Sequence, residues 1–234
     1  NPNKWGRGIT TIWIASHSGV LKRNNVELEL FDTTFYKNWS DKEIDLNTKN
    51  LQFKKSNYNS LVKYIDNDVF NDLQEKVNYF KPDIIFWSAL SSHIHGEGEY
   101  ISLDYGYELI KNLKSKALFI AGGIKATDNP KRILEKFKKI NYLISGESEL
   151  VLLDLINSFP NTKLMNQING VSFHNGLDII TNKPQKIISN LDLISPYDYN
   201  IFDKNVLKRP YNGEVINAID YEISRGCIYS CSYC

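Results

Sequence analysis

Apolar positions along residues 1–159 change repeatedly between helical spacing and short continuous runs. Five segments with helical spacing, or with the end signals of a helix, are predicted to be helical. Pro82 ends the second of them, and Pro130 suits the first turn of the fourth, where a backbone N–H has no helical partner. The predicted helices cover residues 9–21, 61–80, 99–114, a stretch that begins near 130, and 150–159.

Four other segments have the patterns of strands. IIFWSAL (84–90) is a continuous apolar run, which is typical of a parallel strand with both faces covered. VELELFD (26–32) alternates apolar and acidic residues, as expected of an edge strand with one face in water. The two remaining predicted strands are ALFIA (117–121) and NYLIS (141–145).

The alternation of these strands and helices predicts an α/β fold with an open, parallel, doubly wound sheet. In a Rossmann-like sheet of the flavodoxin type, we expect a central strand to precede Asn1 and residues 26–32 to form an edge. Ligands of such sheets bind beyond the carboxyl ends of the strands. Four loops are therefore candidates for a binding site, at residues 1–8, 91–98, 122–128 and 146–149.

The pattern changes after Phe159. VSFHNGLDIIT (171–181) predicts a hairpin whose turn residues, Asn175 and Gly176, supply positive φ angles. An extended linker follows, and residues 216–224 are predicted to lead as a strand into Arg225 and the first cysteine. The predicted parts are an α/β domain at 1–160, a hairpin and linker at 161–212, and the start of another domain at 213–234.

Composition excludes several classes of function. The 234 residues carry 28 basic and 27 acidic side chains, so charge gives no reason to expect a nucleic-acid or membrane partner. The apolar runs are far shorter than a bilayer span, and no secretory signal opens the chain. An odd number of clustered cysteines is typical of a reducing compartment, so we expect a cytoplasmic protein. The chain starts without Met and stops on a cysteine, and we expect it to be part of a longer protein.

The chain has only three cysteines, Cys227, Cys231 and Cys234, and all lie within its last eight residues. The spacing Cys-x₃-Cys-x₂-Cys allows three thiolates to converge on one metal centre. A structural zinc ion normally takes four protein ligands, whereas a 4Fe–4S cluster held by three cysteines keeps one iron open for chemistry. A zinc module with a further ligand, or three unrelated thiols, are the alternatives.

CIYSCSYC resembles the cluster loop of radical S-adenosylmethionine (radical SAM) enzymes, which has an aromatic residue before its last cysteine. The resemblance implies that Cys227, Cys231 and Cys234 bind a 4Fe–4S cluster and that Tyr233 lies against the adenine of the cofactor. S-adenosylmethionine would chelate the open iron and be cleaved to a 5′-deoxyadenosyl radical. The strand before the loop would be the first of a partial α/β barrel.

The upstream segments FKPDIIFWSA, FIAGGIKAT, ISGESE and SNLDLISPYDY resemble the cobalamin-binding domain that precedes many radical SAM modules. The resemblance implies that bare backbone at Gly122 and Gly123 admits the nucleotide tail of cobalamin. Hydroxyl groups near the same edge would hydrogen-bond to that tail, although each alone is also a common helix cap. The candidate cobalamin contacts are Ser91, Ser92, Gly122, Gly123, Thr127 and Gly146.

Other polar residues have plainer explanations. Residues 1–6, NPNKWG, have the spacing of the cobalt-binding Asp-x-His-x-x-Gly of several cobalamin proteins, but Asn stands at both the Asp and the His positions. The lower face of cobalt is therefore expected to lack a histidine from this loop. His93 and His95 are interpreted as solvated imidazoles, with cobalt or another metal within their reach as the alternative, and Glu147 and Glu149 as partners of a helix dipole. His17 and His174 receive no role.

The resemblance implies the amino-terminal part of a cobalamin-dependent radical SAM enzyme. Methyl transfer to an unactivated carbon is the expected reaction, and ring formation or rearrangement are the alternatives within the same architecture. A small-molecule or peptide substrate and an electron donor of the flavodoxin or ferredoxin type would be its partners. Two rival hypotheses remain: a radical SAM enzyme whose first domain binds no cobalamin, and a non-catalytic zinc-binding module.

Overall fold

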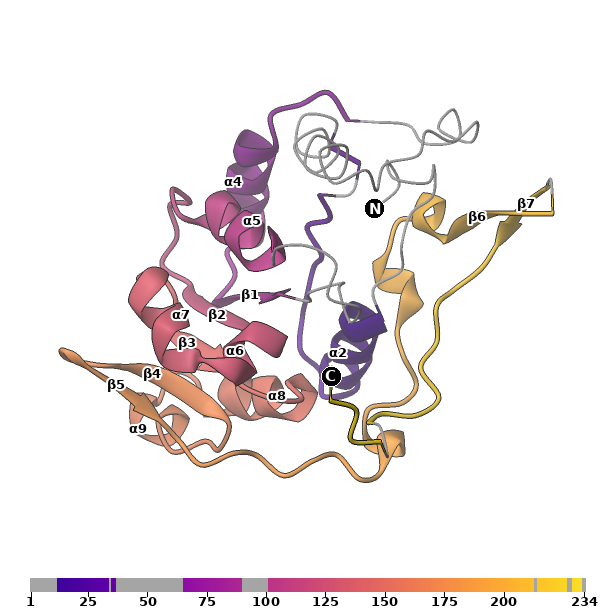
Figure 1. Cartoon of the computed structure of the whole chain (residues 1–234). Coiled ribbons are helices and arrows are strands. Elements are labelled where there is room, and N and C mark those ends of the chain that lie inside the picture. Colours follow the sequence, from indigo (N-terminus) through magenta and orange to yellow (C-terminus); the bar gives the residue numbers. More distant parts are fainter. Residues whose placement is uncertain are drawn as a thin grey trace.

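The computed structural model describes residues 12–33, 35–36, 65–89, 101–212, 214–226 and 229–232. A five-stranded mixed sheet forms its centre, with the strands in the order β1-β2-β3-β4-β5 (Figure 1). The first three strands are mutually parallel, and the last two are antiparallel to their neighbours. The strands are β1 (Ile84–Ala89), β2 (Leu118–Gly123), β3 (Tyr142–Ile144), β4 (Val171–Asn175) and β5 (Asp178–Thr181).

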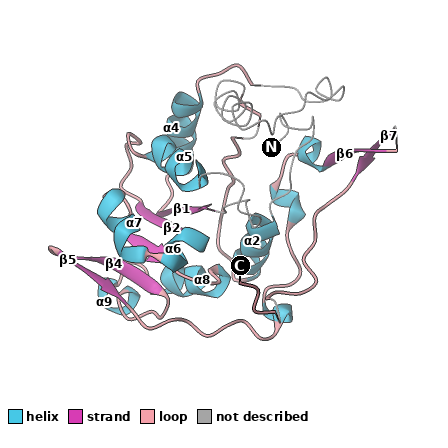
Figure 2. Cartoon of the chain, in the orientation of Figure 1, coloured by secondary structure: helices cyan, strands magenta, loops and turns pink. Residues whose placement is uncertain are grey.

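Helices cover both faces of this sheet, as the predicted α/β architecture requires (Figure 2). Consecutive residues of β2 point to opposite faces, so that Ile120 joins one apolar cluster while Phe119 and Ala121 join two others. One face is covered by α2 (Ile12–Arg23), α8 (Glu149–Ser158) and α9 (Thr162–Met165). The other is covered by α4 (Val69–Phe80), α5 (Ile101–Ile110), α6 (Ile124–Asp128) and α7 (Pro130–Lys136).

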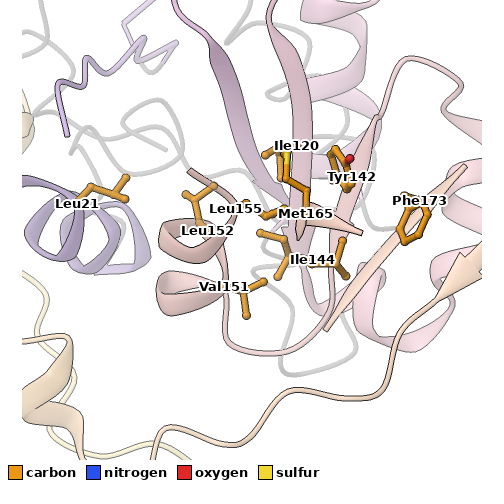
Figure 3. Packing of buried hydrophobic residues seen from close by; sticks show 10 residues of the cluster. Leu21, Ile120, Tyr142, Ile144, Val151, Leu152, Leu155, Met165 and Phe173 are labelled. Atoms are coloured by element: carbon orange, nitrogen blue, oxygen red, sulfur yellow. The ribbon is translucent and has the colours of Figure 1, made fainter. Parts of the chain in front are cut away.

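The largest buried cluster lies between the sheet and α8. Figure 3 shows Val151, Leu152 and Leu155 of α8 turned toward Ile120 and Ile144 of the central strands. Leu155, Ile120 and Ile144 are fully buried, and burying each such side chain stabilises the fold by about 1.5–3 kcal/mol. This packing fixes the start of α8, and hence the loop between β3 and α8, relative to the sheet.

End signals explain where two helices begin. The side chain of Asp68 accepts a hydrogen bond from the N–H of Asn71 and caps α4, which therefore starts at Val69. Our prediction of a helix from residue 61 is wrong at Ile65, which forms an isolated bridge with Tyr36. Asn129 caps α7 in the same way, and Pro130 occupies its first turn as predicted.

Residues 26–32 do not form the predicted edge strand. Their burial alternates as expected, with Val26 and Leu28 packed on the main cluster and Glu27 and Glu29 exposed. The segment is extended but pairs with no strand among the described residues. An alternating pattern indicates that one face is in water, and it does not require a hydrogen-bonded neighbour. The central strand expected before Asn1 lies outside the described residues.

The predicted hairpin is confirmed, and it continues the sheet, because β4 pairs with β3. The register pairs Asn175 with Asp178, so the two loop residues are Gly176 and Leu177. Gly176 has a φ of 64°, whereas Asn175 has no positive φ and ends β4, contrary to our prediction. Glycine at the first of two loop positions is the pattern of a type II′ turn.

The linker after β5 passes along α2 toward the final segment. Three short turns interrupt it, at η2 (Leu191–Leu193), η3 (Tyr199–Ile201) and η4 (Lys204–Leu207). A two-stranded ribbon of β6 (Lys208–Tyr211) and β7 (Glu214–Asn217) follows. The strand predicted at 216–224 is thus shorter and earlier than expected, and residues 218–226 pair with no strand in the described part of the chain. No helix in the described part of the chain has both the length and the apolar character of a membrane span.

Candidate functional site

Three of the predicted glycines meet at the carboxyl edge of the parallel strands. Gly122 and Gly123 end β2, where Gly122 pairs with Ile144 of the neighbouring β3. Gly146 follows β3 after one residue. Gly123 has a φ of 112° and Gly146 a φ of 81°, and both angles strongly favour glycine. These two glycines are therefore required by the backbone whether or not a ligand binds.

Gly122 differs from them because nothing in the backbone or the packing requires it. A Cβ atom placed there would lie 3.5 Å from the carbonyl oxygen of Ile144 and 3.5 Å from the ring of Phe86, which are ordinary contacts. Alanine would therefore fit within the protein itself. Gly122 itself is buried, and the partly exposed Gly123 beside it presents backbone at the edge of the sheet where ligands of this architecture bind.

Thr127 joins the two loops at this edge. Its hydroxyl donates to the carbonyl oxygen of Gly123 at 3.3 Å and accepts from the N–H of Gly146 at 2.7 Å. The hydroxyl of Ser145 makes a second link, to the carbonyl oxygen of Ala126 at 2.9 Å. Thr127 thus holds the loop after β2 against the loop after β3, and its hydroxyl keeps one acceptor position for a ligand.

The remaining predicted site residues are only partly placed. Cys231 is a free, exposed cysteine, as a metal ligand on a surface loop must be before its metal binds. The described residues contain no group of three metal-binding side chains. The predicted residues outside the described ranges are Ser91, Ser92, His93, His95, Cys227, Tyr233, Cys234 and the segment 1–6.

A buried ionic cluster, which the sequence analysis missed, lies between the final segment and the β3–α8 loop. The guanidinium group of Arg225 contacts carboxylate oxygens of Glu149 at 2.6 Å, Glu222 at 2.7 Å and Glu147 at 3.2 Å. Glu149 is 3% exposed, and the side chain of Arg225 is 19% exposed. We refer to Arg225, Glu147, Glu149 and Glu222 as the Arg225 cluster.

Further polar contacts extend the Arg225 cluster to α2. The hydroxyl of Ser16 donates to Glu149 at 2.8 Å. The neighbouring His17 lies with Nδ1 2.6 Å from the carbonyl oxygen of Trp13 and Nε2 2.9 Å from the hydroxyl of Ser148. Because a carbonyl only accepts, Nδ1 carries the proton and Nε2 accepts from Ser148. The ring of His17 also stacks on Phe86 of β1.

Burial and charge shift the pKa values in this cluster. Burial lowers the pKa of His17, although the Glu149 carboxylate acts in the opposite direction, so the imidazole is neutral at pH 7. Burial alone would raise the pKa of Glu149, but the hydrogen bond and charge of Arg225 outweigh it and lower that pKa. Burial likewise opposes the charge of Arg225, yet Glu149 and Glu222 raise its pKa. Glu149 and Arg225 are therefore both ionised.

One sequence signal pointed toward this arrangement. Glu147 and Glu149 follow a strand of the sheet directly, and Arg225 precedes the first cysteine by two residues. The dipole at the start of a helix is enough to explain two glutamates there. The sequence therefore provided no reason to expect that they pair with a distant arginine. The structure shows instead that Glu149 is buried and paired across 76 residues of sequence.

Comparisons with known proteins identify proteins that match between 54% and 93% of this chain. No family model matches it. It is 31% identical over 166 residues to an anaerobic magnesium-protoporphyrin IX monomethyl ester cyclase of Cereibacter sphaeroides, covering 69% of this chain and 26% of the cyclase. It is 30% identical over 129 residues to the cobalamin-dependent radical SAM methyltransferase TokK of Streptomyces tokunonensis, covering 54% of this chain and 19% of TokK. The chain thus spans about a quarter or less of these relatives.

A solved structure has the same fold. The radical S-adenosylmethionine methyltransferase TsrM of Kitasatospora setae, solved with cobalamin and a [4Fe-4S] cluster bound, superposes with a TM-score of 0.50 at 16% identity. The match covers 93% of this chain and 30% of TsrM. The α/β fold class is confirmed, and the resemblance to cobalamin-dependent radical SAM enzymes is confirmed by the relatives and the fold.

Proposed function

We propose that this chain, a relative of the cobalamin-dependent radical SAM enzymes, contains the cobalamin-binding domain of such an enzyme and the start of its radical SAM domain. The division at residue 160 and the linker at 161–212 are part of this proposal. The observation that carries it is the meeting of Gly122, Gly123 and Gly146 at the carboxyl edge of the parallel strands, where ligands of such sheets bind. The relatives named above support the choice of cobalamin as the ligand at that edge.

The residues at this edge fit the nucleotide tail of cobalamin. Gly122 and Gly123 leave room for close approach, and the hydroxyl of Thr127 keeps an acceptor position beside them. Gly146 lies next to Thr127, and Ser91 and Ser92 follow β1, which pairs with β2 at the same edge. These residues would hold and orient the tail through backbone and hydroxyl groups.

The three cysteines fit a 4Fe–4S cluster by the chemistry of their donor atoms. Thiolates are the usual protein ligands of such clusters, and Cys231 is exposed and free to bind. Cys227 and Cys234 would complete the set, and Tyr233 would cover the adenine of S-adenosylmethionine. The bound groups would supply radical formation from S-adenosylmethionine and methyl transfer by cobalamin.

The relatives' names support the kind of reaction proposed, and its carbon target and partners are part of the proposal. One relative is named a methyltransferase and another a cyclase, and we propose methyl transfer to an unactivated carbon for this protein. Its substrate would be a small molecule or peptide, and a flavodoxin- or ferredoxin-type protein would supply electrons. We place the reaction in the cytoplasm, where the clustered thiols stay reduced.

Metal analysis tests the proposal. The full-length protein, purified without oxygen from cells supplied with cobalamin, is expected to contain about four irons and one cobalt per chain. Addition of S-adenosylmethionine and dithionite should then yield 5′-deoxyadenosine. Iron without cobalt would contradict the cobalamin site while keeping the radical chemistry. Zinc without iron would overturn the enzyme hypothesis.

A further inference from the structure

Arg225 is the ionic anchor of the segment that precedes the cysteines, and this segment also contacts the linker through the rings of Tyr221 and Tyr197 and through the hydroxyl of Tyr199. Its neighbours Ile219, Tyr221 and Ile223 are exposed, between 50% and 86%, so they bury little surface against the rest of the molecule. The Arg225 side chain is 19% exposed and reaches Glu147 and Glu149, which lie 78 and 76 residues earlier in the chain. In Figure 1 the carboxyl-terminal segment accordingly lies beside α2 and α8.

The receiving side of this contact is rigid. Glu149 is the first residue of α8, and its carboxylate accepts a hydrogen bond from the hydroxyl of Ser16 in α2. Oε2 of Glu147 accepts from the N–H of Ile188 at 2.6 Å, and the carbonyl oxygen of Glu147 accepts from the side chain of Gln185. Each carboxylate is therefore held by a second element before Arg225 binds. The two carboxylates that bind Arg225 are thus already held in place. Binding therefore costs less side-chain entropy than it would with mobile glutamates.

The residue after Arg225 has a backbone conformation that favours glycine. Gly226 has a φ of 89°, and a side chain at that position would meet only open space. The angle, and not crowding, therefore calls for glycine. The cysteine loop begins at the next residue, so its starting direction depends on where Arg225 is held.

The docking point also adjoins the candidate cobalamin edge. Glu147 is the neighbour of Gly146, whose N–H is bound by Thr127. One short loop, residues 146–149, thus contacts the glycine edge on one side and the segment before the cysteines on the other. A displacement of Arg225 would change the separation of the two cofactor sites without touching either.

We propose that Arg225 is a positioning residue that docks residues 218–226, the segment before the cysteines, on the β3–α8 loop and so sets the distance between the proposed iron–sulfur and cobalamin sites. The two-site part of this inference rests on the proposed function. The docking itself does not, because it concerns only residues of this chain.

Two measurements test the docking and the distance between the two sites separately. Hydrogen–deuterium exchange of residues 218–226 reports the docking with or without cofactors. Electron–electron dipolar spectroscopy between the reduced cluster and cob(II)alamin reports the distance between the two sites in the holoenzyme. The test variant is Arg225→Gln, and Arg225→Lys keeps the charge without the forked geometry. Glu222→Gln is the matched control, because Glu222 binds Arg225 from the same segment and glutamine can still accept the 3.5 Å hydrogen bond from the hydroxyl of Tyr197 in the linker.

In Arg225→Gln we expect exchange at 218–226 to accelerate about tenfold or more, since a buried carboxylate loses its partner. The dipolar distance distribution should broaden while iron and cobalt contents stay the same. Glu222→Gln should leave both readouts close to those of the unchanged protein. Unchanged exchange and distance in Arg225→Gln, or an equal release in Glu222→Gln, would overturn the proposal.

Failure of a variant to fold and failure of the protein to bind its cofactors each have a separate test. If Arg225→Gln does not fold, the double variant Arg225→Ala with Glu149→Gln removes both charges and leaves no side chain at 225 that can reach α8. A folded double variant with a released segment supports the proposal, and one with a protected segment contradicts it. If the unchanged protein binds no cluster or no cobalamin, the proposed function fails, and hydrogen exchange alone decides whether Arg225 docks the segment.

Discussion

Nε2 of His17 lies 2.9 Å from the hydroxyl oxygen of Ser148, and this contact joins α2 to the start of α8 behind the carboxyl edge of the sheet. The ring is almost completely buried, and burial lowers its pKa below 6.5. The neutral imidazole is therefore part of the packed structure, and a proton added to it must be accommodated without water.

Acid should consequently weaken the fold through His17. Between pH 6.5 and its lowered pKa, the unfolded chain binds a proton at this residue more readily than the folded chain does. The contribution of neutral His17 to the free energy of unfolding is thus complete above pH 6.5 and declines as the pH falls, by at most about 1.4 kcal/mol per pH unit. Urea unfolding at a series of pH values measures this slope.

The variant His17→Gln should reduce that slope between pH 6.5 and 5. Asn157→Ala, which changes an exposed residue of α8 that carries no titratable group, is the control and should keep it. An undiminished slope in His17→Gln would show that another group causes the acid sensitivity.

Glu149 and Glu147 should differ in their effect on stability. Glu149 is 3% exposed and Glu147 is 23% exposed, although both bind Arg225. Replacement of Glu149 by Gln leaves the guanidinium group without its closest partner and should lower the free energy of unfolding by about 3–5 kcal/mol. Glu147→Gln should cost about 1 kcal/mol, because solvent screens its pair. Equal losses in urea unfolding would contradict this ranking.

Replacement of Gly122 and of Gly123 by alanine should have different effects on cobalamin binding and on stability. Gly122→Ala makes only ordinary contacts, so stability should change little while the cobalt content of the purified protein falls. Gly123→Ala forces a side chain onto a φ of 112° and should destabilise the chain by about 1–3 kcal/mol. Thermal unfolding and cobalt analysis of both variants provide the test. Full cobalt content in Gly122→Ala would remove the main support for the proposed site.

Gly19→Ala should loosen the linker from α2. A Cβ atom at Gly19 would collide with the backbone carbonyl oxygen of Pro196, which also accepts a hydrogen bond from Arg23. Overpacking against backbone costs about 1–3 kcal/mol, which exceeds the gain in helix propensity. The exposed α8 residue Asn157, changed to Ala, is the control and should not destabilise. A melting temperature that does not fall in Gly19→Ala would show that the linker can shift freely.

Cys231→Ser should abolish cluster binding without unfolding the chain. The sulfur is exposed and free, so its loss removes no packing, whereas a cluster loop with two thiolates holds iron poorly. Iron per chain should fall from about four to below one, and the melting temperature of the metal-free protein should stay unchanged. Ser232→Ala is the neighbouring control. Undiminished iron in Cys231→Ser would exclude Cys231 as a ligand.

Local patterns were sufficient for much of the fold. β1, β2 and β3 follow from short apolar runs, and the start of α7 follows from Asn129 and Pro130, because each signal acts within a few residues. The three-cysteine spacing is likewise local and needs no tertiary information to indicate a metal centre. The glycines at 122 and 123 were recognised because they follow a buried strand.

Only the tertiary structure decided the contacts between distant segments. Residues 26–32 have the alternation of a strand but no strand pairing, since pairing depends on a neighbour that the pattern does not describe. His17 and Glu149 looked like ordinary helix residues until the packing of α2 on α8 buried them. Arg225 pairs with Glu149, which lies 76 residues earlier in the chain. Burial removes the water that would otherwise solvate each charge, so each charge needs an ionic partner. The sequence by itself determined which chemistry the chain carries, and tertiary packing decided which residues hold it in place.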